Sequence, residues 1–267
     1  MNIQDKSHDH VNILGVNVSK LGVHEVVNLI GKAASLRTKT IFDYANVHAL
    51  NTAYETPWLR DFYNRCEVVF CDGYGVKLAT SILGDSIPQR FTPPDWISSM
   101  ARQCLLSNQT LFFLGGREGV AERAAATLVA QHPGLIIVGA FHGYFDKEKD
   151  SQENREVLAK VNAHSPDILI VGFGIPAQEK WLLENVPQLS AGVFLATGAM
   201  FDYISGEMPR SPSWMTNRGF EWLGRLFAEP GRLWRRYLLG LPVFFIRVLR
   251  QKFGLLPHKL PSNGLTK

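Results

Sequence analysis

Short apolar segments alternate along most of the chain with segments of helical periodicity, and this alternation restricts the fold more than any other feature. The pattern predicts helices at residues 23–35, from about 47, and at 119–131, and strands at 11–18, 39–44, 67–71, 110–114, 135–140, 167–171 and 192–196. Strands that alternate with helices of about 10–15 residues are typical of βαβ units. The sequence therefore predicts an α/β, Rossmann-like fold in which a mostly parallel sheet is flanked by helices.

Glycines and polar residues follow several of the predicted strands. They are Asn46, Asp72, Gly115-Gly116, Gly172-Phe173-Gly174 and Gly198. In open α/β sheets, ligands bind in the crevice beyond the carboxyl ends of the strands. We therefore expect the active site at this edge of the sheet.

Asp72 is the candidate catalytic residue. It ends an apolar strand, and the glycines at 73 and 75 allow the backbone to turn sharply and expose the carboxylate. A carboxylate in a pocket can take a proton from an attacking hydroxyl group, which is the task of a general base. An aspartate that caps the next helix fits the local sequence equally well.

Two glycine-rich turns are candidate phosphate sites. Gly115-Gly116 and the loop that begins with Gly172 and Gly174 each separate a strand from a helix, where free backbone N–H groups suit a phosphate. The alternative is that the glycines only permit tight turns. The second loop also matches the dinucleotide fingerprint G-x-G-x-x-A, which raises the alternative of an NAD-dependent oxidoreductase. That alternative requires an acidic ribose partner about 20 residues further on; residues 192–196 contain none, and Asp202 lies too far along.

Three more polar residues near these turns are candidate substrate ligands. Gln178 and Glu179 open the helix that follows Gly174 and could bond a sugar or a base edge, although Glu179 also suits the first turn of any helix. Arg90 begins a turn-rich loop, residues 90–95, where it could meet a phosphate. It could equally be a solvated loop arginine.

Basic residues are concentrated at the end of the chain. Residues 210–267 contain 11 lysines and arginines and two acids, a local charge of +9, whereas the remaining residues carry −5. This asymmetry indicates an anionic partner: a phospholipid surface, a pyrophosphate or a nucleic acid. Interleaved apolar residues favour the first two, and no nucleic-acid-binding motif is present. We predict a catalytic α/β domain at 1–209 and a basic, amphipathic helical appendage at 210–267 that associates with membranes.

The arginines of this appendage are spaced to cluster. Arg225, Arg232 and Arg236 lie seven and four residues apart, with Arg235 beside them, and Pro230-Gly231 breaks or kinks the helix between. Arginine forks match diphosphate oxygens, and the neighbouring aromatic residues suit a headgroup interface. A solvated basic face, or a non-enzymatic membrane adaptor, is the alternative. The adaptor leaves Asp72, Asn46 and Gln178 without a purpose.

Membrane spanning is not expected. The longest strongly apolar stretch, residues 237–246, has ten residues, whereas a spanning helix needs about 20. The stretch can lie on a membrane without crossing it. The start of the chain is polar and does not resemble a secretory signal, and three cysteines without metal-type spacing suit reduced thiols in the cytoplasm.

Seven segments, between about residue 11 and residue 240, carry a specific resemblance. They are NVHALNTAYE, CDGYGVKLA, residues 90–95, LFFLGG, VGFGIPAQEKWL, GAMFDYISGEMPRSP and FEWLGRLFAEPGRLWRRYLLG. Together they resemble the bacterial WecG/TagA/CpsF glycosyltransferases. The resemblance implies transfer of a sugar, with inversion, from a UDP-sugar to an undecaprenyl-diphosphate-linked sugar in surface polysaccharide biosynthesis. It also implies a peripheral enzyme on the cytoplasmic face of the plasma membrane that needs no metal or other cofactor.

The resemblance also assigns roles to residues. Asp72 falls on the proposed base, and Asn46, Arg90 and Gln178 fall on polar positions of the family's active site. Arg225, Arg232 and Arg235 fall on arginines thought to close over the site and meet the diphosphate. The chain departs from the family at Tyr44, where threonine is common, and at Pro93-Pro94, which puts the identity of the sugar in doubt. A homo-oligomer is compatible with all of this.

Overall fold

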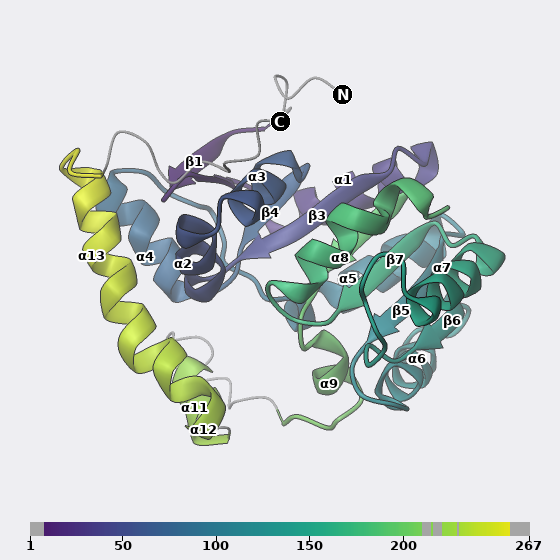
Figure 1. The fold of residues 1–267 in the computed structure, drawn as a ribbon. Coiled ribbons are helices and arrows are strands. Elements are labelled where there is room, and N and C mark those ends of the chain that lie inside the picture. The colour runs from purple at the N-terminus through teal and green to yellow at the C-terminus, as the bar shows by residue number, and fades with distance from the viewer. Residues whose placement is uncertain (1–7, 210–214, 216–220, 229, 257–267) are drawn as a thin grey trace.

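The structure, a computed structural model, describes residues 8–209, 215, 221–228 and 230–256 (Figure 1). Its centre is a six-stranded sheet in the order β4-β3-β8-β7-β5-β6, and all recorded pairings in this sheet are parallel. The strands are β3 (Thr40–Ala45), β4 (Val68–Cys71), β5 (Thr110–Gly115), β6 (Ile136–Phe141), β7 (Ile168–Gly172) and β8 (Val193–Ala196). The predicted α/β fold with a mostly parallel sheet is confirmed.

The prediction of a single strand at residues 11–18 is wrong. The segment forms an antiparallel hairpin of β1 (His10–Ile13) and β2 (Val16–Ser19), which is a separate two-stranded sheet. Leu14 and Gly15 make the turn with φ angles of 52° and 89°. Glycine adopts positive φ without steric cost, so Gly15 was the signal for a turn in the middle of the apolar run.

Helices cover both faces of the large sheet. On one face lie α1 (Val23–Leu36), α5 (Pro93–Leu106), α6 (Val120–Gln131) and α9 (Met200–Ile204). On the other face lie α2 (Val47–Glu55), α3 (Pro57–Arg65), α4 (Tyr74–Leu83), α7 (Gln152–His164), α8 (Ala177–Asn185) and the hairpin. Side chains of a strand alternate between the faces: Phe113 packs into the first layer, and Phe112 and Leu114 into the second.

The end of the described chain is helical. It consists of α11 (Glu221–Ala228), α12 (Pro230–Trp234), a π-helical turn (Arg235–Leu239) and α13 (Gly240–Lys252). Pro242 lies in the first turn of α13, and a proline supplies no backbone N–H for the hydrogen bonds of the preceding turn. This missing donor is one physical reason for the π-helical geometry there. The described residues of the basic segment are thus helical. Residues 210–214 and 216–220 lie outside the described part, and the basic helical appendage as a whole stays a prediction.

Helix α13 is joined to the rest of the protein by buried contacts. In Figure 1 it is the long yellow helix that lies beside α2 and α4, and it packs against both. Phe244 and Val248 are fully buried in the same core as α2, α4 and the hairpin. Arg247 bonds Glu55, and Gln251 bonds the backbone of the hairpin at Leu14 with a distance of 2.8 Å. One side of α13, in the basic segment, is thus part of the hydrophobic core. The domain boundary between residues 209 and 210 stays a prediction.

Replacing Phe244 by alanine tests this packing. Phe244→Ala should lower the free energy of unfolding by about 3–5 kcal/mol, because it leaves a cavity between α13 and the body. Val243→Ala, which truncates the adjacent and 40% exposed side chain, is the matched control and should change it little. The measurement is urea unfolding followed by circular dichroism. Equal effects of the two variants would mean that α13 is not docked as described.

Candidate active site

A groove runs along the carboxyl edge of the sheet. It consists of three adjoining hollows of about 690, 1220 and 1160 Å³. The first and second hollows share Asn46, Asp72 and Arg236, and the second and third share Phe173, Gly174 and Gly198. Strands in a parallel sheet all end at the same edge, so residues far apart in the sequence meet here. The predicted location of the site at this edge therefore coincides with the main groove.

Asp72 lies in the first and second hollows, directly after β4. Its backbone N–H donates to the carbonyl of Ala45 at the end of β3, with a distance of 2.9 Å. Gly73, with a φ of 98°, is the N-cap residue of α4 and turns the chain after Asp72. Asp72 is therefore not itself the cap residue, and its side chain is placed at the wall of the groove.

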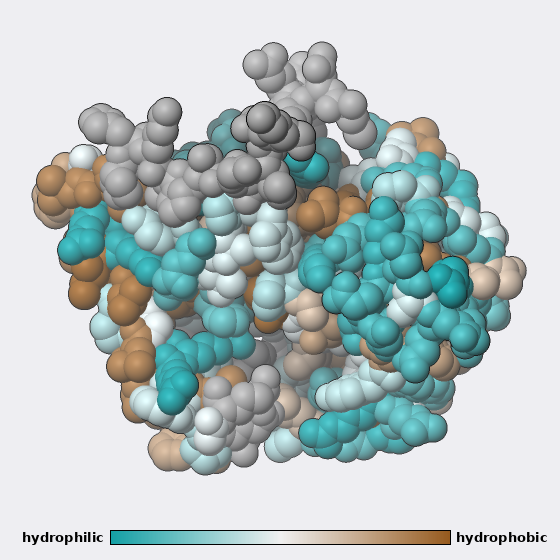
Figure 2. All heavy atoms as spheres, viewed as in Figure 1, coloured by the Kyte–Doolittle hydropathy of each residue, from teal (hydrophilic) through white to brown (hydrophobic). Residues whose placement is uncertain are grey.

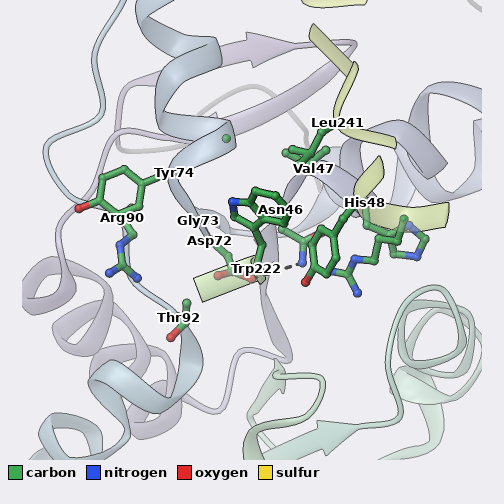
Figure 3. A pocket seen from close by; sticks show the side chains of 13 residues that line it. Asn46, Val47, His48, Asp72, Gly73, Tyr74, Arg90, Thr92, Trp222 and Leu241 are labelled. Atoms are coloured by element: carbon green, nitrogen blue, oxygen red, sulfur yellow. Dashed lines mark hydrogen bonds between the residues drawn. The ribbon is translucent and has the colours of Figure 1, made fainter. Parts of the chain in front are cut away.

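Asn46 orients the carboxylate of Asp72. The side-chain oxygen of Asn46 accepts the N–H of Ala49 at 2.9 Å and so caps α2. Because the oxygen is engaged by the helix, the amide nitrogen must point the other way, and it donates to Oδ2 of Asp72 at 3.3 Å. Figure 3 shows this bond as a dashed line, with Trp222 beside it. The cap of one helix thus fixes the direction of a hydrogen bond in the site.

Arg90 lies on another wall of the first hollow, near Thr92 (Figure 3). Its guanidinium lies 3.5 Å from the carboxylate of Asp95 and 5.0 Å from the ring centroid of Tyr74. Asp95 also accepts the backbone N–H and the hydroxyl of Thr92, at 2.9 and 3.0 Å, in the capping box of α5. The side chain of Arg90 is only 12% exposed, so it is a held cation and not a solvated loop residue.

The C-terminal helical segment closes the groove from the opposite side. Trp222, Arg236, Tyr237 and Leu241 line the first hollow, and the rings of Trp222 and Tyr237 are 5.7 Å apart. Of the arginines predicted to meet a diphosphate, Arg236 faces the groove. Arg235 is exposed and stacks on Trp234 at 5.2 Å instead. The side chains of Arg225 and Arg232 lie outside the described part of the structure.

The predicted glycine loops line the far end of the groove. Gly116, Gly172 and Gly174 border the third hollow together with the cations Arg117 and Lys147. Gly174 has a φ of 84° and open space where a Cβ would stand. Gly115 has a different role, because a Cβ on it would stand 2.4 Å from the carbonyl oxygen of Gly172. It permits the ends of β5 and β7 to pack closely, and it does not line a hollow.

Gln178 and Glu179 are both fully buried, beneath the groove. The side-chain oxygen of Gln178 accepts the N–H groups of Gly174 and Gly198, at 3.2 and 3.1 Å, and its amide nitrogen donates to Glu179 at 2.9 Å. The sequence predicts direct contact with substrate for both residues. Their burial beneath the groove does not support that contact. The start of α8 turns into the core, so these side chains hold the loops that line the groove.

Tyr44 lies in the second hollow at the end of β3. Its hydroxyl oxygen is 2.5 Å from the position that a Cβ on Gly198 would take. Any larger residue at position 198, in the loop after β8, would therefore clash with Tyr44. Burial is the largest cause of a strongly raised pKa for Tyr44, followed by the negative charge of Glu179. The phenol is therefore neutral and can donate a hydrogen bond in the groove.

His48 is a residue of the site that the sequence interpretation missed. It lies in the first turn of α2, two residues after Asn46, and lines both the first and the second hollow. Burial, and after it the charge of Arg236, lower its pKa to about 4. The imidazole is neutral near pH 7 and can accept or donate one hydrogen bond. Nothing in the local sequence pattern shows that His48 faces the groove.

The first hollow combines an oriented carboxylate with two cations, Arg90 and Arg236, and an aromatic wall. A carboxylate so placed can take a proton from a hydroxyl group, and fixed cations stabilise charge on a departing phosphate. Among residues 8–209, 215, 221–228 and 230–256, no group of three or more His, Cys, Asp or Glu side chains could hold a metal ion. The site is that of an α/β group-transfer enzyme.

Sequence comparison names the class more closely. The profile of the glycosyl transferase WecG/TagA/CpsF family matches residues 11–257, and the chain belongs to this family. It is similar to an N-acetylglucosaminyldiphosphoundecaprenol N-acetyl-beta-D-mannosaminyltransferase of Bacillus spizizenii, with 27% identity over 77% of each chain. A Staphylococcus aureus enzyme of the same name is 25% identical over 94% of this chain and 97% of its own. The protein is a glycosyltransferase, and the oxidoreductase alternative is wrong.

The neutral state of His48 has a consequence for stability. The unfolded protein binds a proton at His48 below pH about 6.5, and the folded protein does so only below about 4. Between these values the unfolded state holds more protons, so stability must fall as the pH falls, by at most about 1.4 kcal/mol per pH unit. His48→Gln removes this component, and we expect the variant to lose less stability than the wild type between pH 7 and pH 5 in urea unfolding. Identical losses would contradict the buried, neutral imidazole.

Proposed function

We propose that the protein transfers a sugar of the N-acetylhexosamine class from a UDP-sugar to a sugar linked to undecaprenyl diphosphate, in surface polysaccharide biosynthesis. The printed names of its relatives state this acceptor and an N-acetylmannosaminyl transfer for those proteins. The observation that carries the proposal is the carboxylate of Asp72, oriented by Asn46 in a groove that also holds Arg90 and Arg236. Glycosyl transfer to a hydroxyl group needs both a base and compensation of phosphate charge.

The reaction proposed is a single displacement. Asp72 takes the proton of the acceptor hydroxyl as the oxygen attacks the anomeric carbon, and UDP leaves from the opposite face, which inverts the configuration. Two ends of the groove are available for the two substrates. The third hollow, lined by the glycine loops and the cations Arg117 and Lys147, suits the nucleoside diphosphate. The first hollow, beside Arg236 and the aromatic wall, suits the lipid diphosphate.

No metal is assigned a role in this proposal. The sequence contains no D-x-D motif. The cations that line the groove, Arg90, Arg236, Arg117 and Lys147, support stabilisation of a departing diphosphate by protein side chains. The test incubates the full-length protein with a panel of UDP-sugars and a short-chain lipid-diphosphate-linked N-acetylglucosamine, with and without EDTA. Release of UDP that EDTA does not reduce is the expected result. No release with any donor contradicts the function, and inhibition that added Mg²⁺ reverses contradicts the metal-independent mechanism.

We further propose that the enzyme works at a membrane surface. No helix among the described residues is long and apolar enough to cross a membrane. Figure 2 nevertheless shows hydrophobic residues, in brown, at the surface over α13. The exposed apolar side chains of the π-helical turn and α13 include Leu238, Leu239, Val243, Ile246, Leu249 and Phe253. Arg250 and Lys252 are exposed on the same helix. Apolar and basic residues together are the composition of a helix that lies in a headgroup interface.

The exposed apolar face of the C-terminal helices and the groove lie on two sides of the same helical segment. Arg236, Tyr237 and Leu241 line the first hollow, and they belong to the same helical segment whose outer side is apolar. A lipid held in the leaflet under α13 would present its diphosphate next to Arg236. The C-terminal segment would then supply both membrane affinity and one wall of the site. We propose the cytoplasmic face of the plasma membrane as its location, since a UDP-sugar is the donor.

Asp72→Asn tests the base. The amide can still accept the hydrogen bond from Asn46, so folding and the KM for the UDP-sugar should stay close to those of the wild type. Turnover should fall by about 10²–10⁴-fold, because the variant cannot take a proton. Asp85→Asn, at an aspartate beyond α4 that pairs with Lys20, is the matched control and should keep its rate. A variant at position 72 with more than about half the rate would remove Asp72 from this role.

The membrane face has its own test. The double variant Ile246→Glu/Phe253→Glu should bind vesicles of anionic phospholipid at least about tenfold more weakly, because it adds two negative charges and removes two apolar side chains. Turnover of a short-chain, water-soluble acceptor should be unchanged. Leu106→Glu, at an 86% exposed leucine at the end of α5, is the control. Vesicle binding at wild-type strength in a sedimentation assay would exclude α13 as the membrane contact.

A further inference from the structure

Two fully buried carboxyl groups lie beneath the groove and have no role in the mechanism above. Asp43 is in β3, and Glu179 is in the first turn of α8. One oxygen of each is bonded: Oδ1 of Asp43 accepts the N–H of Tyr44 at 2.7 Å, and Oε1 of Glu179 accepts from Gln178 and Tyr63 at 2.9 and 3.4 Å. Within the described part of the chain, the second oxygens, Oδ2 and Oε2, have no hydrogen-bond partner.

Two ionised carboxylates are not stable in this environment. Neither Asp43 nor Glu179 forms an ion pair among the described residues, and burial of an unpaired charge is costly. Burial, and then the charge of Glu179, raise the pKa of Asp43 well above its ordinary value, and burial likewise raises the pKa of Glu179. The pKa of the nearby phenol of Tyr63 is raised as well, so it stays neutral. A proton placed between Oδ2 and Oε2 would satisfy both orphaned oxygens and leave one negative charge.

The bonded oxygen of Glu179 has a fixed task. Gln178 must direct its amide oxygen at the N–H groups of Gly174 and Gly198, since both are donors. Its amide nitrogen is then forced toward Glu179 and requires an acceptor there. The two loops that Gln178 ties together line the second and third hollows. Glu179 therefore acts on the groove through Gln178 without touching it.

We propose that Asp43 and Glu179 share one proton, and that this acid–carboxylate pair positions Gln178 and, through it, the Gly174 and Gly198 loops that hold the donor diphosphate. Glu179 is in this account a positioning residue. The second half of the proposal rests on the function proposed above, whereas the shared proton does not. In this proposal the shared proton lies at Oε2 of Glu179, the oxygen without a hydrogen-bond partner, and Oε1 stays free to accept from Gln178.

Two substitutions in the full-length protein separate the alternatives. In Glu179→Gln the amide oxygen accepts from Gln178 and Tyr63, and the amide N–H donates to Asp43, so the pattern of bonds and the net charge are both preserved. Its kcat/KM for the UDP-sugar should stay within about threefold of the wild type. Glu179→Leu leaves the nitrogen of Gln178 without an acceptor and should lower kcat/KM by about 10²-fold, mainly through KM for the donor. A purely structural role would reduce the fraction of active enzyme in both variants and leave KM unchanged.

Infrared spectroscopy measures the proton without reference to activity. The wild type at neutral pH should show the C=O stretching band of a protonated, buried carboxyl group, and Glu179→Gln should lack it, because Asp43 then accepts from an amide. A wild type without this band overturns the shared proton, even if Glu179→Leu fails to fold. If the wild type is active and Glu179→Leu has the same KM for the UDP-sugar, the positioning role is overturned. A wild type that releases no UDP contradicts the proposed function alone, and the infrared result still decides the proton.

Discussion

Parallel pairing of the six strands of the large sheet determines where the groove and its polar side chains lie. Because every strand of the large sheet runs in one direction, the residues after β3, β4, β7 and β8 meet at one edge. The hydrogen bond from the N–H of Asp72 to the carbonyl of Ala45 extends the pairing of β3 and β4 into the loops. It brings Asn46 and Asp72 together although 26 positions separate them. The site is a consequence of the sheet, completed by helix caps.

The second determinant is the docking of α13. Phe244 and Val248 bury one side of this helix in the core, which holds the π-helical turn before it over the groove. That turn carries Arg236 and Tyr237 on the inner side and leaves Leu239 on the outer side. The same element therefore has three surfaces with different chemistry: an apolar one in the core, a cationic and aromatic one in the groove, and an apolar and basic one in solvent.

Much of the fold, and part of the site, could be predicted from the sequence. Asp72 and Asn46 were found because a polar residue after an apolar strand has a definite location in an α/β fold. His48 was missed because it lies within a helix, where nothing in the local pattern shows which side faces a cavity. The choice between Arg235 and Arg236 depends on the winding of a π-helical turn, which spacing rules for regular helices do not describe. The burial of Glu179 depends on how α8 enters the core, and a first-turn glutamate looks the same whether exposed or buried.

In the proposed mechanism one groove holds both substrates, with the acceptor hydroxyl against Asp72. The most direct measurement is a crystal structure of the full-length protein with UDP and a short-chain lipid-diphosphate-linked N-acetylglucosamine bound. We expect an acceptor hydroxyl within about 2.6–3.2 Å of the Asp72 carboxylate, the lipid diphosphate against Arg236, and UDP beside the Gly116 and Gly174 loops. An acceptor bound away from Asp72, or both diphosphates outside the groove, would contradict this mechanism.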